Sequence, residues 1–307
     1  MSDIVSKIRR ALKSPEKILL NIIYNVPLLK KMSDEKYISL LFRVTYGRKI
    51  NLKNPETFNE KLNWLKLNDR KDIYTKMVDK NLAKEYVANI IGQEYIIPTI
   101  GTYNSFNEID FNKLPEKFVM KCNHDSGNVI ICTDKNKMDV KTIRKRMEKS
   151  FNKDFYLINR EWPYKNIQRK IIVEKYMKDK NSDDLTDYKF YCFNGIPQYL
   201  YISEGLANHN SSRLDFFDME FNKAPFGRRD YKHFDNNPKK PENFNKMIEL
   251  SKELSKNIPF LRVDFYEINK KIYFSELTFS PCGGFMKFYP KEWDKKLGSM
   301  LNIKYKI

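Results

Sequence analysis

Apolar and polar residues follow two different patterns along this chain, and the change comes near residue 115. Residues 33–90 carry apolar side chains at helical spacing. Asn54-Pro55-Glu56 supplies a capping residue followed by a proline, which suits the start of a helix. A second helix is expected near residues 72–90, and a short strand is expected at residues 96–100. The first third of the chain is therefore predicted to be largely helical.

From residue 115 onwards, short apolar runs alternate with helical patterns. Strands are predicted at residues 118–122, 129–132, 171–177, 187–193, 197–203 and 213–218, and helices at residues 139–151 and 242–257. Asn194-Gly195 lies between two of these strands and is a strong signal for a tight hairpin. Residues 219–241 are rich in Pro, Asn, Lys and Arg and are expected to form a long loop. The whole pattern predicts a mixed α+β chain.

Residues 262–278 are predicted to form a β-hairpin, because two apolar-aromatic runs flank a polar Asn-Lys-Lys turn. Asp264 lies in the first strand and Glu276 in the second, so the hairpin could bring the two carboxylates together. Two carboxylates suit a hard cation such as Mg²⁺ that also binds substrate phosphates. Arg262 lies two residues before Asp264 and is expected on the same strand face. A surface hairpin with solvated charges is the alternative at this point.

Two further segments carry residue types that suit a nucleotide. Lys121 ends a strand before a polar loop that contains His124, Ser126 and Gly127. Loop N–H groups and a nearby lysine can bind phosphate oxygens, but the loop lacks the Walker pattern, and an ordinary turn explains it better when it is taken alone. Glu174 lies in an apolar strand that could line a purine pocket. The alternative is a buried strand whose glutamate points to solvent.

The charge balance narrows the class of partner. The chain has 57 Lys and Arg against 39 Asp and Glu, a net charge of +18, which suits an anionic partner. No zinc-finger, RNA-recognition or helix-turn-helix pattern accompanies this charge, so nucleic acid is not the expected partner. The basic run at residues 135–175 favours an acidic glycan or an anionic lipid-linked precursor. Trp162 and Tyr164 in that run could stack on sugar rings or could be buried aromatics.

The N-terminal residues 1–31 carry seven basic and two acidic side chains, with apolar residues at helical spacing. This pattern suits a helix that lies on the inner, anionic face of a membrane, and it suits an ordinary packed amphipathic helix equally well. No signal-peptide pattern is present, and no apolar run is long enough to span a bilayer. The four cysteines form no C-x-x-C pair and are expected to be reduced. The expected location is the cytoplasm, with peripheral contact to the membrane through residues 1–31.

The order of these features resembles the ATP-grasp superfamily, and within it the TupA-like branch associated with teichuronopeptide and capsular polysaccharide biosynthesis. The segments that carry the resemblance are residues 118–124, 160–167, 187–195 and 262–278. The resemblance implies an α+β fold in which two lobes grip ATP between their sheets. It divides the chain into a basic N-terminal segment (1–31), a helical pre-domain (32–114), a small lobe (115–180) and a large lobe with the metal site (181–307).

The resemblance also implies a role for each candidate residue, with ATP and Mg²⁺ as cofactors. The residues implied for ATP are Lys80, Lys121, Ser126, Gly127 and Lys189 at the phosphates, and Glu174, Lys175 and Met177 at the adenosine. The implied Mg²⁺ ligands are Asp264, Glu276 and Thr278, and the implied catalytic contacts are Arg262, Lys189 and His124. ATP-grasp enzymes commonly have Glu-x-Asn where this chain has Glu276-Leu277-Thr278. Thr278 or Ser280 would therefore be a weaker third ligand.

The reaction implied by the resemblance is the ATP-dependent joining of a carboxylate to an amine through an acyl phosphate. The carboxylate would belong to a uronic-acid glycan or lipid-linked precursor, and the amine to an amino acid or a similar donor. A glycosyltransferase of the same pathways would also need a bound cation and basic residues, although no Asp-x-Asp motif is present. A non-enzymatic basic module is the third hypothesis. It would not require Lys121, Glu174, Asp264 and Glu276 to come together.

Overall fold

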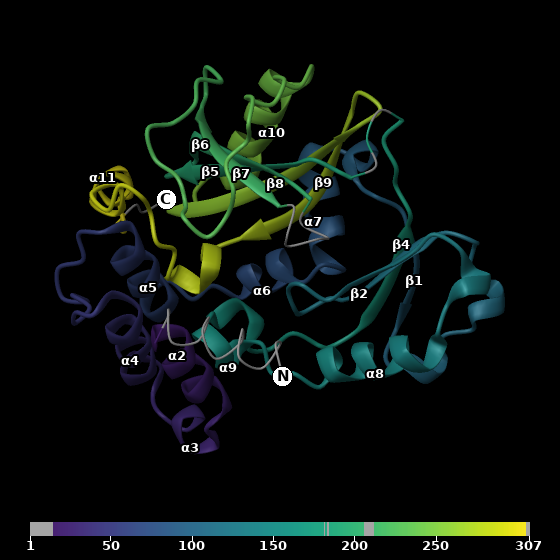
Figure 1. Cartoon of the computed structure of the whole chain (residues 1–307), viewed down its shortest axis with the longest axis horizontal. Coiled ribbons are helices and arrows are strands. Elements are labelled where there is room, and N and C mark those ends of the chain that lie inside the picture. The colour runs from purple at the N-terminus through teal and green to yellow at the C-terminus, as the bar shows by residue number, and fades with distance from the viewer. Residues whose placement is uncertain (1–14, 181, 183, 206–211, 305–307) are drawn as a thin grey trace, which may run out of the picture.

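The computed structural model describes residues 15–180, 182, 184–205 and 212–304. Two antiparallel sheets form two lobes, one above the other in Figure 1, and a group of helices lies beside them. The residues before position 15, which belong to the predicted membrane-binding segment, lie outside the described part of the chain. Within the described part, no helix is long and apolar enough to cross a membrane.

The helical region precedes both sheets, as the apolar spacing predicts. Its helices are α2 (Pro15–Asn25), α3 (Pro27–Lys30), α4 (Asp34–Tyr46), α5 (Phe58–Asn68), α6 (Asp72–Val78) and α7 (Leu82–Ile91). α5 begins later than the Asn54-Pro55-Glu56 pattern suggests. Thr57 and Glu60 form a capping box there, in which each side chain accepts a hydrogen bond from the other residue's backbone N–H. This reciprocal cap explains why the helix starts at Phe58.

The small lobe is a four-stranded sheet in the order β1-β4-β2-β3. Its strands are β1 (Thr99–Tyr103), β2 (Phe118–Cys122), β3 (Val129–Cys132) and β4 (Ile171–Lys175). The apolar face of this sheet packs against α8 (Val140–Phe151), which lies below the sheet in Figure 1. β1 pairs with β4 along its length, so the sheet takes in residues that precede the lobe boundary expected at residue 115. Without β1, β4 would be the edge strand of this sheet.

The large lobe is a five-stranded sheet in the order β7-β6-β5-β8-β9. Its strands are β5 (Asp187–Phe193), β6 (Ile196–Glu204), β7 (Arg213–Asp218), β8 (Phe260–Ile268) and β9 (Lys271–Thr278). One face packs against α7 and α10 (Phe244–Ser255), and the other face packs in part against α5 and α11 (Trp293–Met300). The strands and helices predicted from residue 187 onwards are confirmed, with boundaries shifted by a few residues.

Both predicted hairpins close through two-residue turns with positive φ. Asn194 and Gly195 have φ values of 51° and 79°, and Asn269 and Lys270 have φ values of 51° and 64°. This backbone matches the twist of antiparallel strands, and Gly195 adopts it at no steric cost. The β8–β9 pairing also contains an irregularity between Asp264 and Phe265. This β-bulge changes which side chains of β9 face those of β8.

One face of the large sheet changes from apolar to charged along its strands. On β8, Phe260, Arg262 and Asp264 lie on this face. On the neighbouring strand β5, Phe193 lies opposite Phe260, and Lys189 lies opposite Asp264. The apolar end packs edge-on against the first residue of α5. The same strands therefore bury a hydrophobic core at one end and hold a cluster of charges at the other.

Candidate functional site

A cluster of buried charges lies at the centre of the large sheet. Asp264 is fully buried and accepts hydrogen bonds from Arg262 through Nε at 2.7 Å and Nη2 at 2.6 Å. Lys189 on the neighbouring strand donates to the same carboxylate at 2.8 Å and to Asp187 at 3.0 Å. Register explains this convergence, since Lys189 pairs directly with Asp264. The predicted placement of Arg262 and Asp264 on one strand face is confirmed.

Glu276 joins this cluster from β9. Its carboxylate lies 2.6 Å from Nη2 of Arg262, the same nitrogen that binds Asp264. One guanidinium nitrogen therefore bridges the two carboxylates that sequence patterns select as metal ligands. Thr278 donates a hydrogen bond to Glu276 at 3.2 Å. In this arrangement the Thr278 hydroxyl orients the glutamate.

The cations of the cluster determine the protonation of Glu276. Burial alone would raise the pKa of Glu276, but the charges of Arg262, Lys189 and Lys80 outweigh burial and lower the pKa to about 2. Burial likewise opposes the charge on Lys189, yet Asp187 and Asp264 hold its pKa well above the ordinary value. The cluster therefore keeps its charges near neutral pH. Lys80 belongs to the segment between α6 and α7, and both helices contact β9, which places that segment beside the large sheet.

A second charged cluster lies on the small sheet. Glu174 of β4 is buried and pairs with Lys121 of β2 at 2.7 Å and with Lys84 of α7 at 2.6 Å. Lys84 also donates to the backbone oxygen of Ile97 at 2.8 Å. Glu174 therefore does not point to solvent. Sequence patterns missed Lys84, because a lysine in an amphipathic helix gives no signal until the helix is docked.

The pKa of Glu174 gives a stability test of this second cluster. Burial would raise it, but Lys121 and Lys84 outweigh burial and lower it from 4.5. A depressed carboxyl pKa stabilises the fold above the unfolded-state value, and this contribution is lost as pH falls through the folded-state value. We expect the stability difference between wild type and Glu174→Gln to be constant near pH 6 and to shrink below about pH 4.5. Urea unfolding between pH 3 and pH 6 measures it, and a pH-independent difference contradicts the pairing.

The start of the polar loop is fixed by Asn123, which is fully buried. Its side-chain amide donates to Asp79 at 2.8 Å and to the backbone oxygen of Gln168 at 2.9 Å, and its side-chain oxygen accepts from the backbone of Lys170 at 2.8 Å. The backbone N–H of Lys80 donates to the backbone oxygen of Asn123 at 3.1 Å. The Lys80 ammonium donates to the backbone oxygen of Asp125. These bonds bring Lys80 to the predicted loop.

The other predicted loop residues lie in different surroundings. Ser126 and Gly127 are exposed at the tip of the loop, and Gly127 has a φ of 85° with open space where a Cβ would lie. His124 is buried beneath the loop and packs edge-on against Phe151 of α8. Burial lowers the pKa of His124. The structure therefore buries His124 against α8 of the small lobe.

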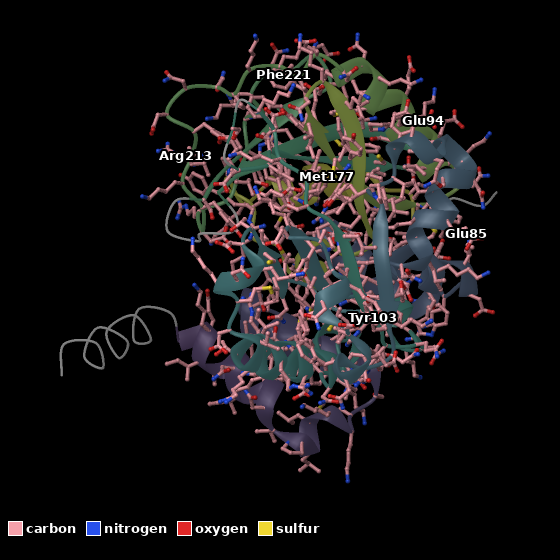
Figure 2. All side chains as sticks on the ribbon, turned by 90° about the vertical axis from the view of Figure 1, so that its right-hand side faces the viewer. Glu85, Glu94, Tyr103, Met177, Arg213 and Phe221 are labelled. Carbon is pink, nitrogen blue, oxygen red and sulfur yellow. The ribbon has the colours of Figure 1, made fainter. Side chains whose placement is uncertain are left out.

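The segment after β4 connects the two lobes. Lys175 is exposed, and its backbone N–H donates to the oxygen of Pro98 at 3.0 Å. Met177 is half-buried, and Figure 2 shows it at the level where the two lobes meet. The backbone N–H of Lys180 donates to the side chain of Asn269 at 3.0 Å. The tip of the β8–β9 hairpin thus holds the connecting segment that is expected to line the adenosine pocket.

A buried pair that sequence patterns missed, Lys66 of α5 and Glu161, lies at the junction of the helices and both lobes. Lys66 donates to the backbone oxygens of Asn159 and Gly283 at 2.7 Å each. Burial raises the pKa of Glu161 and lowers that of Lys66, and each is affected by the charge of the other. Arg262 also affects the pKa of Glu161. The junction therefore lies close to the charged cluster of the large sheet.

Two hollows accompany these clusters. The larger, about 630 Å³, lies between α4 and α5 and is lined by side chains that include Trp64, Asp34 and Arg70. None of the predicted site residues lines it. A much smaller one is lined by Lys66, Trp162 and residues that follow β9. Trp162 therefore borders a hollow at the junction of the lobes.

The donor set of the large-sheet cluster fits Mg²⁺. Within residues 15–304 as the structure describes them, no group of three or more His, Cys, Asp or Glu side chains converges as a ready metal site. Magnesium in nucleotide enzymes usually needs only one or two carboxylates, because substrate phosphates and water complete its octahedron. Asp264 and Glu276 supply two carboxylates, which meets this requirement. Each of them lies 2.6 Å from the same cationic nitrogen. The space they share already holds a positive charge.

The two lobes, each with an antiparallel sheet and a buried charged cluster, agree with an ATP-grasp protein, a class of ligases that use ATP and a divalent cation. The TupA-like ATP-grasp family matches residues 60–302, which is most of the chain. This chain therefore belongs to the TupA-like ATP-grasp family. The α+β fold implied by the sequence resemblance is confirmed.

Solved structures of two ligases are similar to this chain at low sequence identity. D-alanine–D-alanine ligase from Bacillus anthracis, complexed with ATP, is 16% identical with a TM-score of 0.40, and the match covers 73% of this chain and 63% of that one. The Helicobacter pylori ligase is 14% identical with a TM-score of 0.43, covering 80% and 69%. The chain thus spans less than two thirds of the Bacillus anthracis ligase. A search of curated proteins found no match.

Proposed function

We propose that this protein is an ATP-dependent carboxylate–amine ligase that acts in cell-surface polysaccharide biosynthesis. The observation that carries the proposal is the pair of carboxylates, Asp264 and Glu276, bridged by Arg262 in the large sheet. Lys121 of the small sheet and Lys84 of α7 supply positive charge beside it, as the phosphates of a bound nucleotide require. A non-enzymatic basic module would have no reason to bury these charges in two separate sheets.

Each cluster has a distinct part in the proposed reaction. Lys121 and Lys84 hold the phosphates nearer the nucleoside, and Glu174 keeps the two ammonium groups in place. Lys189 and Arg262 bind the transferred phosphate. Asp264 and Glu276 would hold Mg²⁺, which would neutralise negative charge on the phosphates. Met177 and the backbone of Lys175 border the adenosine.

The proposed chemistry is carboxylate activation. An oxygen of the substrate carboxylate attacks the γ-phosphorus of ATP, the bond to the β–γ bridging oxygen breaks, and ADP leaves. The nitrogen of the amine then attacks the acyl carbon, inorganic phosphate leaves, and the amine loses a proton as the amide forms. Positioning and charge stabilisation account for most of the catalysis of such phosphoryl transfers. The buried cations of the large sheet supply that stabilisation without a nucleophilic side chain.

The substrate class rests on charge and on the family. A uronic-acid glycan or an anionic lipid-linked precursor would complement the net charge of +18. The chain matches the TupA-like family, and the sequence resemblance to that branch implies a role in teichuronopeptide or capsular polysaccharide biosynthesis. The amine donor is an amino acid or a similar small amine in this proposal. No feature of the described residues favours a nucleotide sugar over ATP, so the glycosyltransferase hypothesis becomes an outcome of the test.

Thermal unfolding with different nucleotides tests the proposal. We expect MgATP to stabilise the protein and UDP-sugars to leave it unchanged, because a ligand at 100 times its Kd adds about 2.7 kcal/mol. Lys121→Met should lose most of the MgATP effect, whereas Lys145→Met, an exposed lysine of α8, should keep it. Stabilisation by UDP-sugar alone would overturn the ligase proposal in favour of the glycosyltransferase.

Turnover then identifies the substrates. Phosphate release is measured with a panel of uronic acids and amines in the presence of MgATP. We expect release that requires both a carboxylate and an amine, with ADP formed in equal amount. Nucleotide binding without release for any pair in a broad panel would count against carboxylate activation.

A further inference from the structure

Helix α2 presents two apolar faces, and among the residues that the structure describes only one of these faces is covered. Ile23 and, in part, Leu20 and Tyr24 pack against Tyr37 and Leu41 of α4. Ile18, Leu19 and Ile22 lie on another side of the helix and are exposed. At 100° per residue these three side chains fall within an arc of about 100°, which is the width of a helix face that contacts a partner.

A further exposed apolar residue lies in α3, the next helix along the chain. Leu28 follows the end of α2 and is 72% exposed, the highest value among the large hydrophobic residues that the structure describes. We call Ile18, Leu19, Ile22 and Leu28 the α2–α3 apolar surface. Thirteen large hydrophobic residues are exposed in the described parts of the chain, and four of them fall within this short stretch. Such clustering marks an interaction surface, since single exposed residues elsewhere need no partner.

Positive charge surrounds this surface. Lys17, Lys30 and Lys31 are exposed beside it. The acidic neighbour Glu16 is paired with Lys287 at 2.7 Å. By sequence, residues 1–14 add Lys7, Arg9, Arg10 and Lys13 against one acidic residue, Asp3. An apolar surface with a basic border is complementary to an anionic membrane, where each basic residue near the surface contributes about 1 kcal/mol.

A second copy of the chain fits the same surface poorly. A two-fold dimer places one surface against itself, so the lysines at its border would face the same lysines of the partner. Like charges that meet across an interface cost free energy, whereas anionic headgroups remove this cost. The charge distribution therefore favours a lipid surface as the occupant.

We propose that the α2–α3 apolar surface docks on an anionic lipid bilayer. α2 and α3 are tied to the junction of the lobes, because Arg160 donates to the backbone oxygen of Lys30 at 2.6 Å and Tyr24 donates to Asn159 at 3.4 Å. Docking through this surface holds the junction, and with it the charged cluster around Arg262, near the membrane. A lipid-linked acceptor would then reach the site without leaving the bilayer. The docking itself does not depend on the proposed reaction.

Vesicle co-sedimentation of the full chain tests the docking. We expect binding to vesicles of phosphatidylcholine with phosphatidylglycerol, weaker binding at high salt, and little binding to phosphatidylcholine alone. Leu19→Ser/Ile22→Ser should weaken binding at least about tenfold, because inserted apolar side chains contribute roughly 0.8 kcal/mol per buried CH₂ group.

The control is a second double variant, at two residues of equal exposure elsewhere on the molecule. Ile131→Ser/Ile196→Ser changes residues that are 51% and 52% exposed, against 50% and 49% for Leu19 and Ile22, and should bind vesicles as wild type does. Thermal unfolding with MgATP verifies that each variant is folded. Equal loss in both double variants, or no binding to anionic vesicles, overturns the proposal. A doubled molar mass in light scattering without vesicle binding would overturn the proposal and assign the surface to a second copy of the chain.

Discussion

Glu276→Gln is expected to lower ADP formation by at least about 100-fold while the protein stays folded. The substitution keeps the shape of the side chain and its contacts with Arg262 and Thr278, but it removes one of the two carboxylates proposed to hold Mg²⁺. With one carboxylate lost, Mg²⁺ is bound less well and the charge of the transferred phosphate is poorly balanced. Loss of one preorganised electrostatic group typically costs 10²–10³ in kcat. Coupled ADP release, measured with the best substrate pair from the panel, gives the comparison.

Two readouts separate a metal ligand from a structural residue. The Mg²⁺ concentration for half-maximal activity should rise in Glu276→Gln, which a merely structural role would not produce. Glu249→Gln, on the exposed surface of α10, should behave as wild type in both respects. Full turnover by Glu276→Gln at ordinary Mg²⁺ would show that Glu276 is not a metal ligand.

Asp264→Asn is expected to cause the largest loss of stability, about 3 kcal/mol. Asp264 is fully buried and neutralises both Arg262 and Lys189. Removing one partner of a buried ion pair usually costs 3–5 kcal/mol, because the remaining charge stays uncompensated. The lower end applies here, since Arg262 keeps Glu276 and Lys189 keeps Asp187 as partners. Urea unfolding monitored by circular dichroism measures the free-energy difference.

Asp215 on β7 is the matched control in the same sheet. It is also buried, but its partners Lys223 and His233 are largely exposed at the surface. Water can solvate these partners when the charge of Asp215 is removed. We expect Asp215→Asn to cost about 1 kcal/mol, the typical contribution of a hydrogen bond, and to leave MgATP stabilisation unchanged. Equal losses for Asp264→Asn and Asp215→Asn would contradict the account of the buried cluster.

Local patterns predicted most of the secondary structure of this chain. The hairpin at Asn194-Gly195 and the strands on either side of Asn269 depend on neighbouring residues, because turn conformation and strand alternation are short-range properties. The sequence pattern misplaces the start of α5, because the capping box formed by Thr57 and Glu60 outweighs the proline signal. Local patterns also do not show which lobe β1 belongs to. β1 joins the small sheet through its pairing with β4, which lies far along the chain.

The candidate site residues also form two groups, those that the sequence indicates and those that only the structure shows. Lys121, Glu174, Asp264 and Glu276 were recognisable, because charged residues in apolar strands stand out and their order resembles a known family. Lys84 and Asn123 gave no such signal. Each gains its role only when a helix or loop from another part of the chain packs against β4. The roles of all these residues towards ATP and Mg²⁺ stay predictions.

The sequence by itself determined the two hairpins, the mixed α+β pattern and the family. It did not determine how the two acidic residues meet. With a regular register from the Asn269–Lys270 turn, Ser275 would lie opposite Asp264 and Glu276 would point to the other face of the sheet. The bulge between Asp264 and Phe265 shifts the pairing by one residue, so that Glu276 lies opposite Asp264. Only the packed structure decides this shift, because a bulge is stabilised by the contacts of the whole cluster, here by the bridge that Arg262 forms between the two carboxylates.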